Sequence, residues 1–222
     1  MKLTIFGATG GIGRNLLDQA LAAGHDVTAV VRRPESLGAT RARLVSADLL
    51  VAQPETLAAA LTGADAVLSA LGPRSTADAN IASRGTRAIL QAMRATGVRR
   101  IVAVSAGPVG TVPSPGRPHP PKHDPGDGFV VRSVLTPILK AALSKQYADL
   151  ALMEDLLRDS GLDWTVIRPS QLINRSVTGV YRTASTRNIR RGLRIARADV
   201  ADLMLRVITR PETIGYAMRI AY

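Results

Sequence analysis

The 222-residue chain has no cysteine, few aromatic side chains and only three histidines. Without cysteine there can be no disulfide, no thiolate nucleophile and no cysteine-ligated metal. His25, His119 and His123 lack the spacing of metal ligands, so we expect no metal site. An aromatic content of 3% argues against a stacking surface for single-stranded nucleic acid.

Long apolar runs are also missing. After Lys2 the chain has only a four-residue apolar run, shorter than the apolar core of a signal peptide, and no segment approaches a membrane span. We therefore expect a cytoplasmic protein with no membrane partner. An apolar content of 46% and a charged content of 21% are ordinary for a globular protein, and the length suits a single domain over residues 1–222.

Acidic residues are scarce relative to basic ones, 17 against 29, which gives a net charge of +12. Such an excess is compatible with nucleic acid, a membrane surface or an anionic ligand as partner. All but four of the basic residues are arginines, and they are spread along the chain without a dense basic tail. We expect a small-molecule substrate and no nucleic acid, in a monomer or homodimer.

Short apolar segments alternate with amphipathic ones along most of the chain. Strands are expected at residues 2–6, 26–31, 43–47, 66–70, 100–104, 163–167 and 216–221. Helices are expected at residues 12–23, 54–61, 78–95, 139–160 and 200–209, the last with Asp199 as its N-cap. This alternation predicts an α/β fold with a doubly wound parallel sheet, the Rossmann fold.

The pattern breaks at residues 106–137, a Pro/Gly-rich insertion after the fifth strand that holds eight of the 13 prolines. Proline removes backbone donors and fixes φ, so this segment cannot be an ordinary crossover helix. Long loops in compact domains commonly close over or bind a ligand. We therefore predict a substrate lid loop.

The first expected strand runs directly into Gly7-Ala8-Thr9-Gly10-Gly11-Ile12-Gly13, and a helix follows. Glycine lets the backbone turn sharply and approach a ligand closely. The N-terminus of the following helix offers free N–H groups and the positive end of a dipole, which suits a pyrophosphate. The G-x-x-G-x-x-G spacing at this place in a βαβ unit predicts a dinucleotide site; a tight turn without a ligand is the alternative.

The second expected strand ends at Arg32 and Arg33, where NAD-specific folds usually carry an acidic residue for the ribose 2′-hydroxyl. No carboxylate lies between Asp26 and Glu35. Guanidinium groups match the geometry of a 2′-phosphate. The pair therefore favours NADPH over NADH, unless both arginines are simply solvated loop residues.

Further short motifs accompany the glycine turn: Val30-Val31-Arg32-Arg33, Ala47-Asp48-Leu49, Ser69-Ala70-Leu71-Gly72, Val104-Ser105-Ala106, Ser160-Gly161-Leu162-Asp163-Trp164-Thr165, Arg168-Pro169, Thr178-Gly179-Val180-Tyr181 and Arg197-Ala198-Asp199-Val200-Ala201. In number and order they resemble the atypical short-chain dehydrogenase/reductases, within which the chain is most similar to the biliverdin-IXβ/flavin reductases and their NmrA-like relatives. The resemblance covers nearly the whole chain.

This resemblance implies roles for individual residues. Asp48 and Leu49 would lie by the adenine, residues 70–72 would line the nicotinamide ribose, and Ser105 would lie near the nicotinamide. With the glycine turn and the arginines, the expected cofactor contacts are Gly7, Thr9, Gly10, Gly11, Ile12, Gly13, Arg32, Arg33, Asp48, Leu49, Ala70, Leu71, Gly72, Arg74, Ser105 and Pro169.

The chain departs from the family at its proton donors. In the Tyr-x-x-x-Lys pair of many relatives Tyr147 is present, but Ala151 replaces the lysine. The biliverdin/flavin reductases lack that pair and carry a histidine after the sixth strand, where this chain has Ser170. The catalytic candidates are therefore Ser105, Tyr147 and Ser170, with the loop histidines as possible substitutes.

Hydride transfer is chemistry that the cofactor carries. A flavin, quinone or tetrapyrrole accepts hydride without a strong acid beside one oxygen, whereas a simple ketone needs that acid more. We therefore expect an NADPH-dependent oxidoreductase for a conjugated acceptor. The main alternative is a non-catalytic NADP(H) sensor of the NmrA-like type. An epimerase, dehydratase or isomerase ranks below both because it would normally require an acid/base pair.

Overall fold

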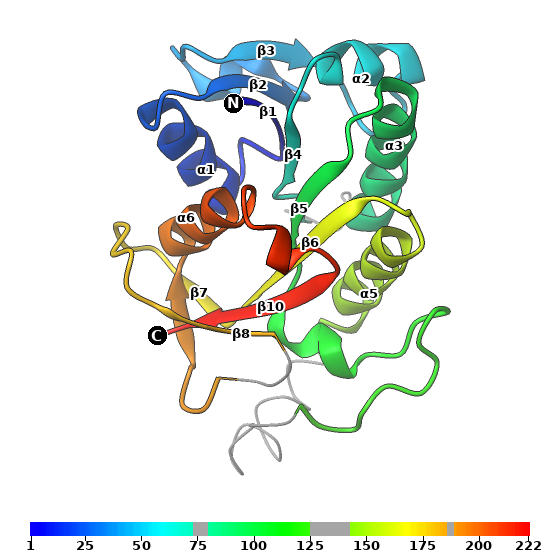
Figure 1. The fold of residues 1–222 in the computed structure, drawn as a ribbon, viewed down its shortest axis with the longest axis vertical. Helices are drawn as coiled ribbons and strands as arrows, with labels where there is room; N and C mark the ends of the chain where they lie inside the picture. Colours follow the sequence, from blue (N-terminus) through cyan, green and yellow to red (C-terminus); the bar gives the residue numbers. More distant parts are fainter. Residues whose placement is uncertain (73–79, 125–142, 186–188) are drawn as a thin grey trace.

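A mostly parallel sheet forms the centre of the molecule (Figure 1). The computed structural model describes residues 1–72, 80–124, 143–185 and 189–222. Its eight strands follow the order β3-β2-β1-β4-β5-β6-β10-β8. Every neighbouring pair is parallel except β10 and β8, which is antiparallel. The predicted doubly wound parallel sheet is thus confirmed.

The observed elements follow the expected ones closely. The strands of the large sheet are β1 (Lys2–Phe6), β2 (Asp26–Val31), β3 (Arg43–Ser46), β4 (Ala66–Ser69), β5 (Arg100–Val104), β6 (Asp163–Pro169), β8 (Arg182–Ala184) and β10 (Tyr216–Ala221). The α-helices are α1 (Gly11–Ala22), α2 (Pro54–Leu61), α3 (Ile81–Thr96), α5 (Ser144–Arg158) and α6 (Arg197–Val207). Short 3-10 turns are η1 (Pro34–Leu37), η3 (Gly107–Thr111) and η5 (Pro211–Thr213).

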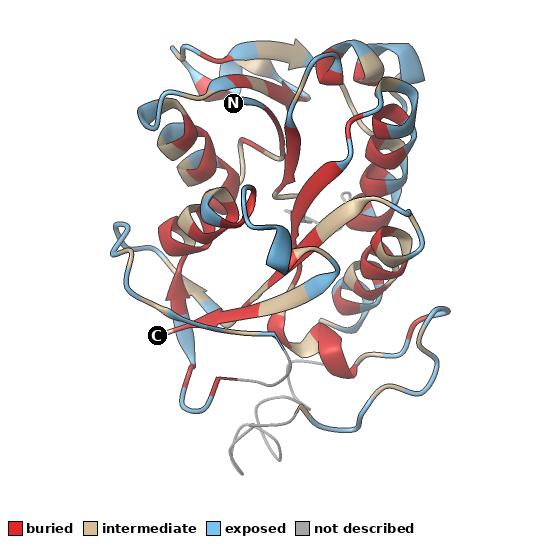
Figure 2. Cartoon of the chain, in the orientation of Figure 1, coloured by how far each residue is buried: buried red, intermediate tan, exposed pale blue. Residues whose placement is uncertain are grey.

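Helices cover both faces of the sheet. Helices α1 and α6 pack together on one face, and α2, α3 and α5 lie in a row on the other (Figure 1). Both faces of the central strands are buried, as the red strands in Figure 2 show. This explains why β5 consists of five buried residues in succession instead of alternating with polar ones.

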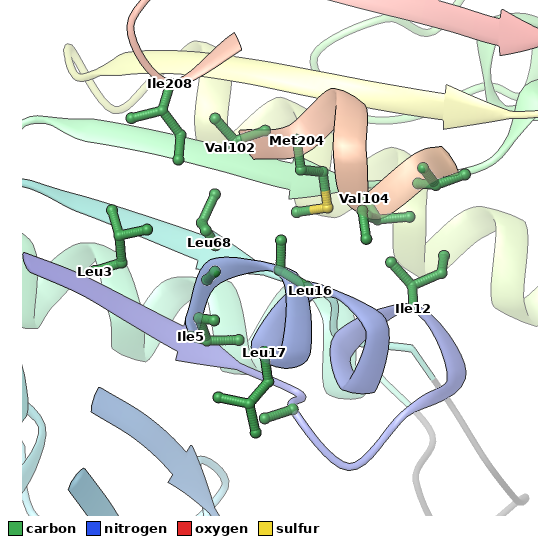
Figure 3. Close-up of a cluster of buried hydrophobic side chains, with 14 of the residues drawn as sticks. Leu3, Ile5, Ile12, Leu16, Leu17, Leu68, Val102, Val104, Met204 and Ile208 are labelled. Carbon is green, nitrogen blue, oxygen red and sulfur yellow. The ribbon is translucent and has the colours of Figure 1, made fainter. Parts of the chain in front are cut away.

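The core beneath α1 comes from the helical stripe seen in the sequence. Ile12, Leu16 and Leu17 face the sheet and meet Ile5 of β1 and Met204 of α6 (Figure 3). Residues spaced three and four apart share one face of a helix, so this stripe fixes which side of α1 packs inward. The packing sets the position of the N-terminus of α1, which matters for the site.

The predicted start of the last helix is wrong. Helix α6 begins at Arg197, and Asp199 lies within its first turn instead of capping it. Its carboxylate accepts hydrogen bonds from the backbone N–H groups of Thr178 (2.8 Å) and Gly179 (2.9 Å) and from the Tyr222 hydroxyl (2.5 Å). Burial alone would raise the pKa of Asp199, but these bonds lower it overall. The side chain therefore anchors a distant loop, which helix-capping rules do not anticipate.

Three short strands were not predicted: β7 (Gln171–Ile173), β8 and β9 (Arg194–Ala196). Strands β7 and β9 form a separate parallel pair. Three residues are too few to display an alternation, so only pairing with a distant segment reveals them. Across the described ranges, no helix combines the length and the apolar character that crossing a membrane demands.

Candidate functional site

The turn between β1 and α1 requires glycine at two positions for different reasons. Gly7 adopts φ = +76°, and a Cβ there would lie 2.6 Å from the carbonyl oxygen of Ala70. A Cβ on Gly13 would lie 2.1 Å from the carbonyl oxygen of Gly7. The turn therefore closes on itself and on the end of β4.

This turn aims the N-terminus of α1 outward. Gly10 precedes the helix, and no side-chain hydrogen bond caps it. The first N–H groups of a helix and its dipole attract anions. A glycine cradle below an uncapped helix start fits the pyrophosphate of a dinucleotide.

A cavity of about 330 Å³ opens at this point. It lies beyond the carboxyl ends of β1 and β4, which are neighbours in the sheet. From β1 the chain adds β2 and β3 on one side, and from β4 it adds β5 and β6 on the other side. Crevices at such switch points are where open α/β sheets bind their ligands. Its lining residues are Gly7, Thr9, Gly10, Gly11, Ile12, Val30, Val31, Arg32, Ala47, Asp48, Leu49, Ala70, Leu71, Gly72, Ile81, Val104, Ser105, Leu150, Leu172 and Arg197.

Most of the expected cofactor contacts lie together on this wall. They are Gly7, Thr9, Gly10, Gly11, Ile12, Arg32, Asp48, Leu49, Ala70, Leu71, Gly72 and Ser105. The structure does not bring Arg33 or Pro169 to the lining, and Gly13 lies beneath the turn instead of facing the cavity. Arg74 lies outside the described residues.

The two arginines after β2 are not equivalent. Arg32 lines the cavity, whereas Arg33 precedes η1 with its side chain exposed. The carbonyl of Arg33 accepts hydrogen bonds from both the backbone N–H and the hydroxyl of Ser36. Of the two arginines, Arg32 is therefore the one that borders the cavity.

Ser105 follows β5 and is buried at the cavity wall. Its hydroxyl donates a hydrogen bond of 2.7 Å to Oε1 of Glu154, which is only 2% exposed. Arg168 of β6 donates to both oxygens of the same carboxylate, at 2.9 Å from its Nε to Oε1. The Ser105 proton is thus directed at Glu154, and the lone pairs of the oxygen are left for a ligand.

Tyr147, a catalytic candidate, is not brought to the cavity lining. It packs against Val109 and Ala151 in a small cluster between α5 and η3. Burial raises the pKa of its phenol. Lys145, two residues earlier, is exposed.

Ser170, the third catalytic candidate, also lies off the cavity lining. Its hydroxyl donates to the carbonyl oxygen of Gly192 at 2.8 Å. The side chain therefore joins the end of β6 to the turn before β9.

The first part of the predicted lid is fixed to α5. Asp155 accepts hydrogen bonds from the Ser114 hydroxyl (3.0 Å) and the Gly116 N–H (2.9 Å). His119 and His123 are exposed, and no residue of 106–124 lines the cavity. The rest of the predicted lid, 125–137, lies outside the described residues.

Two charged residues of the site were missed from the sequence. Glu154 lies on the buried stripe of α5 with Tyr147 and Ala151, so an acid on an otherwise inward-facing stripe was the available signal. Arg197 lines the cavity, where its side chain covers Gly11 and its Nη1 donates to Asn174 Oδ1 at 2.7 Å. Nothing local in the sequence indicated that contact.

Comparison with known proteins shows the family. The profile of the NAD(P)H-binding family matches residues 7–211. YhfK of Bacillus subtilis, described as an uncharacterized sugar epimerase, is 29% identical over 96% of this chain and 90% of its own length. An uncharacterized protein of Mycobacterium tuberculosis is 29% identical over 80% of this chain, which spans only 16% of that relative's length.

Solved structures agree with the observed fold. The oxidoreductase ylbE of Lactococcus lactis has a TM-score of 0.78 and 22% identity, covering 100% of this chain and 90% of its own. ChuY, an anaerobillin reductase of Escherichia coli O157:H7, has a TM-score of 0.76 and 22% identity, with coverage of 100% and 97%. Likeness at this identity establishes the fold.

Proposed function

Because the chain belongs to the NAD(P)H-binding family, we propose that it is an NADPH-dependent reductase that passes hydride to a conjugated acceptor such as a flavin, a quinone or a tetrapyrrole. The observation that carries this proposal is the hydrogen bond from Ser105 to Glu154. It leaves the cavity wall with a hydrogen-bond acceptor where a carbonyl reductase would need a proton donor.

The cofactor, once bound, supplies the hydride. The residues that line the cavity would hold this cofactor. The backbone of the glycine turn and the start of α1 would receive the pyrophosphate, Asp48 and Leu49 would border the adenine, and residues 70–72 would border the nicotinamide ribose.

Arg32 supports the preference for NADPH. It reaches the cavity wall just after β2, where an acidic residue would favour NAD. A charge-assisted hydrogen bond is worth about 1.5–3 kcal/mol, or roughly a 10- to 100-fold preference.

The polar groups on the described wall are few. Thr9, Arg32, Asp48, Ser105 and Arg197 are the side chains there with hydrogen-bonding groups, and none of them is a histidine, tyrosine or lysine. A conjugated acceptor can take its proton from solvent after the hydride arrives. Ser105 would accept a hydrogen bond from an N–H of the nicotinamide carboxamide or of the acceptor, and so orient it.

The absence of a proton donor on this wall also favours a second function, an NADP(H) sensor without turnover. The two functions separate at hydride transfer. The test is to mix purified protein with NADPH and follow its near-ultraviolet absorbance against flavins, quinones, a bilin and simple ketones, with NADH in parallel.

Turnover with a conjugated acceptor and a preference for NADPH would support the reductase. Binding of NADPH without oxidation by any member of the panel would favour the sensor. Turnover confined to simple ketones would contradict the reasoning from Ser105. Ser105→Ala is the matched variant because it removes only the hydroxyl.

A further inference from the structure

The positive charge of the chain is concentrated in one segment. Residues 164–198 contain eight arginines and neither aspartate nor glutamate. They therefore carry two-thirds of the net charge of +12 in about a sixth of the chain. Arg168 is neutralised inside the protein by Glu154, but most of the others are exposed.

This segment borders the cofactor cavity at two of its residues. It leaves the carboxyl end of β6, forms β7, β8 and β9, and runs into α6 (yellow to orange in Figure 1). Leu172 of β7 and Arg197 of α6 line the cavity itself. The backbone N–H of Gln171 bonds to the carbonyl of Leu193 at 3.0 Å, which ties the cavity wall to the turn before β9.

That turn, residues 189–192, presents two exposed arginines from a fixed backbone. We call it the arginine turn. Its ends are joined by the Gly192 N–H to Ile189 carbonyl bond of 2.8 Å, and Ile189 is buried. Arg191 has φ = +60°, the left-handed conformation that an arginine rarely adopts.

Contacts from three other segments hold the arginine turn. The Ser170 hydroxyl donates to the Gly192 carbonyl at 2.8 Å, and Arg182 donates to the Arg190 carbonyl at 2.9 Å. Gly192 lies so close to β10 that a Cβ would approach that of Ala221 to 2.6 Å. A backbone that is strained and anchored from several sides fixes the positions of the side chains it carries.

Three arginines on and beside the arginine turn form no ion pair with an aspartate or glutamate among the described residues. They are Arg190 and Arg191 on the turn and Arg194 just after it, and all three are exposed. In contrast, Arg206 in the adjoining helix is paired with Asp202 at 2.8 Å. Clustered like charges repel one another and favour the approach of an anion.

We propose that the arginine turn binds an anionic group of the acceptor, so that the substrate is a conjugated molecule bearing a phosphate or a carboxylate. This inference rests on the proposed reductase function and narrows its substrate class. The hydride-accepting ring would enter the cavity beside Ser105, and its charged substituent would remain outside on the arginines. Guanidinium groups bind both anions through paired N–H donors.

The test compares two acceptors that share a ring and differ in charge, FMN and riboflavin. The variant is Arg190→Gln with Arg191→Asn, since asparagine tolerates a positive φ and so preserves the turn. The control is Arg84→Gln with Arg87→Gln, which removes two exposed arginines from α3 and changes the net charge equally.

We expect kcat/KM for FMN to fall on the order of 10- to 100-fold in the turn variant, and that for riboflavin to change less than about twofold. The control should leave both acceptors unchanged. An equal loss for FMN and riboflavin, or the same loss in the control, would overturn the proposal. Unchanged melting temperatures establish that both variants are folded.

Failure of the reductase itself is distinguished by binding. With NADP+ present, quenching of flavin fluorescence reports affinity without turnover. Tighter binding of FMN than of riboflavin that depends on Arg190 and Arg191 would support the anion site even if nothing is reduced. Equal affinities for FMN and riboflavin would overturn the anion site. Binding of a short oligonucleotide to the arginine turn that does not displace FMN would also overturn it.

Discussion

The region up to the end of β5, which we call the cofactor half, and the region after β5, which we call the acceptor half after the proposed function, are built by different means. Around the glycine turn, the main chain packs closely against itself. A Cβ added to Gly7 or Gly13 would meet main-chain atoms. Beyond β5, buried carboxylates hold the structure through partners far away in the chain, as Glu154 does with Ser105 and Asp199 with Thr178. The main-chain arrangement suits the nucleotide that members of the NAD(P)H-binding family share. The side-chain pairs beyond β5 could vary with the substrate of the proposed reaction.

The largest effect is expected at the glycine turn. In Gly13→Ala, the new Cβ would meet the Gly7 carbonyl at 2.1 Å, so the turn must open. We expect loss of NADPH binding and a destabilisation of at least about 3 kcal/mol, measured by calorimetric titration and thermal unfolding. Gly63→Ala is the control: Gly63 lies off the cavity lining and a Cβ there meets nothing within 4 Å, so only its φ of +74° adds strain. Equal behaviour of the two variants would contradict the proposed role of the turn.

The next effect concerns the anchoring carboxylate of Asp199. Asp199→Ala leaves the N–H groups of Thr178 and Gly179 and the Tyr222 hydroxyl without their acceptor. We expect a loss of about 3 kcal/mol in the free energy of unfolding, measured with denaturant at neutral pH. A loss below about 1 kcal/mol would show that the anchor contributes little.

The same residue predicts the direction of a pH effect. Because hydrogen bonds lower the pKa of folded Asp199, its contribution is present above the unfolded value of about 3.9 and is lost as pH falls through the folded pKa. Asp155 behaves alike: burial raises its pKa, and bonds from Gly116, Ser114 and Arg158 outweigh that effect. As pH falls, the free energy of unfolding should therefore decrease less in Asp199→Asn than in the natural protein. Parallel curves of the free energy of unfolding against pH would contradict this role of Asp199.

A smaller effect is expected at Glu154. In Glu154→Gln the amide can donate to Ser105, which would turn the hydroxyl proton toward the cavity. We expect kcat/KM for the acceptor to fall about 10-fold, or about 1.4 kcal/mol, with NADPH affinity unchanged. The same loss in Ser105→Ala, with no further loss in the double variant, would establish that the two act as a unit. Additive losses would indicate separate roles.

Arg32 and Arg33 provide the next comparison. Arg32→Ala should weaken NADPH by about 10-fold and leave NADH nearly unchanged, because the 2′-phosphate is the group that distinguishes the two dinucleotides. Arg33→Ala is the matched control and should change neither, since its side chain lies off the cavity wall. Affinities for both dinucleotides follow from fluorescence titration. An equal loss for NADPH and NADH would refute the assignment.

The smallest effect is expected at Tyr147. Tyr147→Phe removes a hydroxyl that lies off the cavity lining, so kcat should change less than about twofold. Steady-state rates with NADPH and the best acceptor provide the measurement. A large fall in kcat with unchanged stability would reinstate Tyr147 as a catalytic residue.

The sequence predicted the cofactor half well because its signals are local. The apolar runs of β1 and β4, the glycine spacing and the stripe of α1 each depend on neighbouring residues, and they determined both the sheet and most of the cavity wall. The switch point between β1 and β4, where the cavity opens, was seen only in the observed strand order.

The acceptor half was less predictable because its determinants are pairs distant in sequence. Glu154 meets Ser105 across 49 positions, and Asp199 meets Thr178 across 21. Strands β7 and β9 form by pairing with each other, and their residues lie far apart in the sequence. Ser170 was identified as a catalytic candidate from its position alone, whereas its hydroxyl is bonded to Gly192, a contact that no local pattern contains.

The most direct test of the central claim is a kinetic isotope effect. NADPH carrying deuterium at the transferred position of C4 is compared with ordinary NADPH in a single turnover with the best conjugated acceptor. We predict slower transfer from the deuterated cofactor, and a further decrease in rate in Ser105→Ala. Full binding of NADPH with no transfer to any acceptor, and hence no isotope effect to measure, would contradict the account and leave a nucleotide sensor in its place.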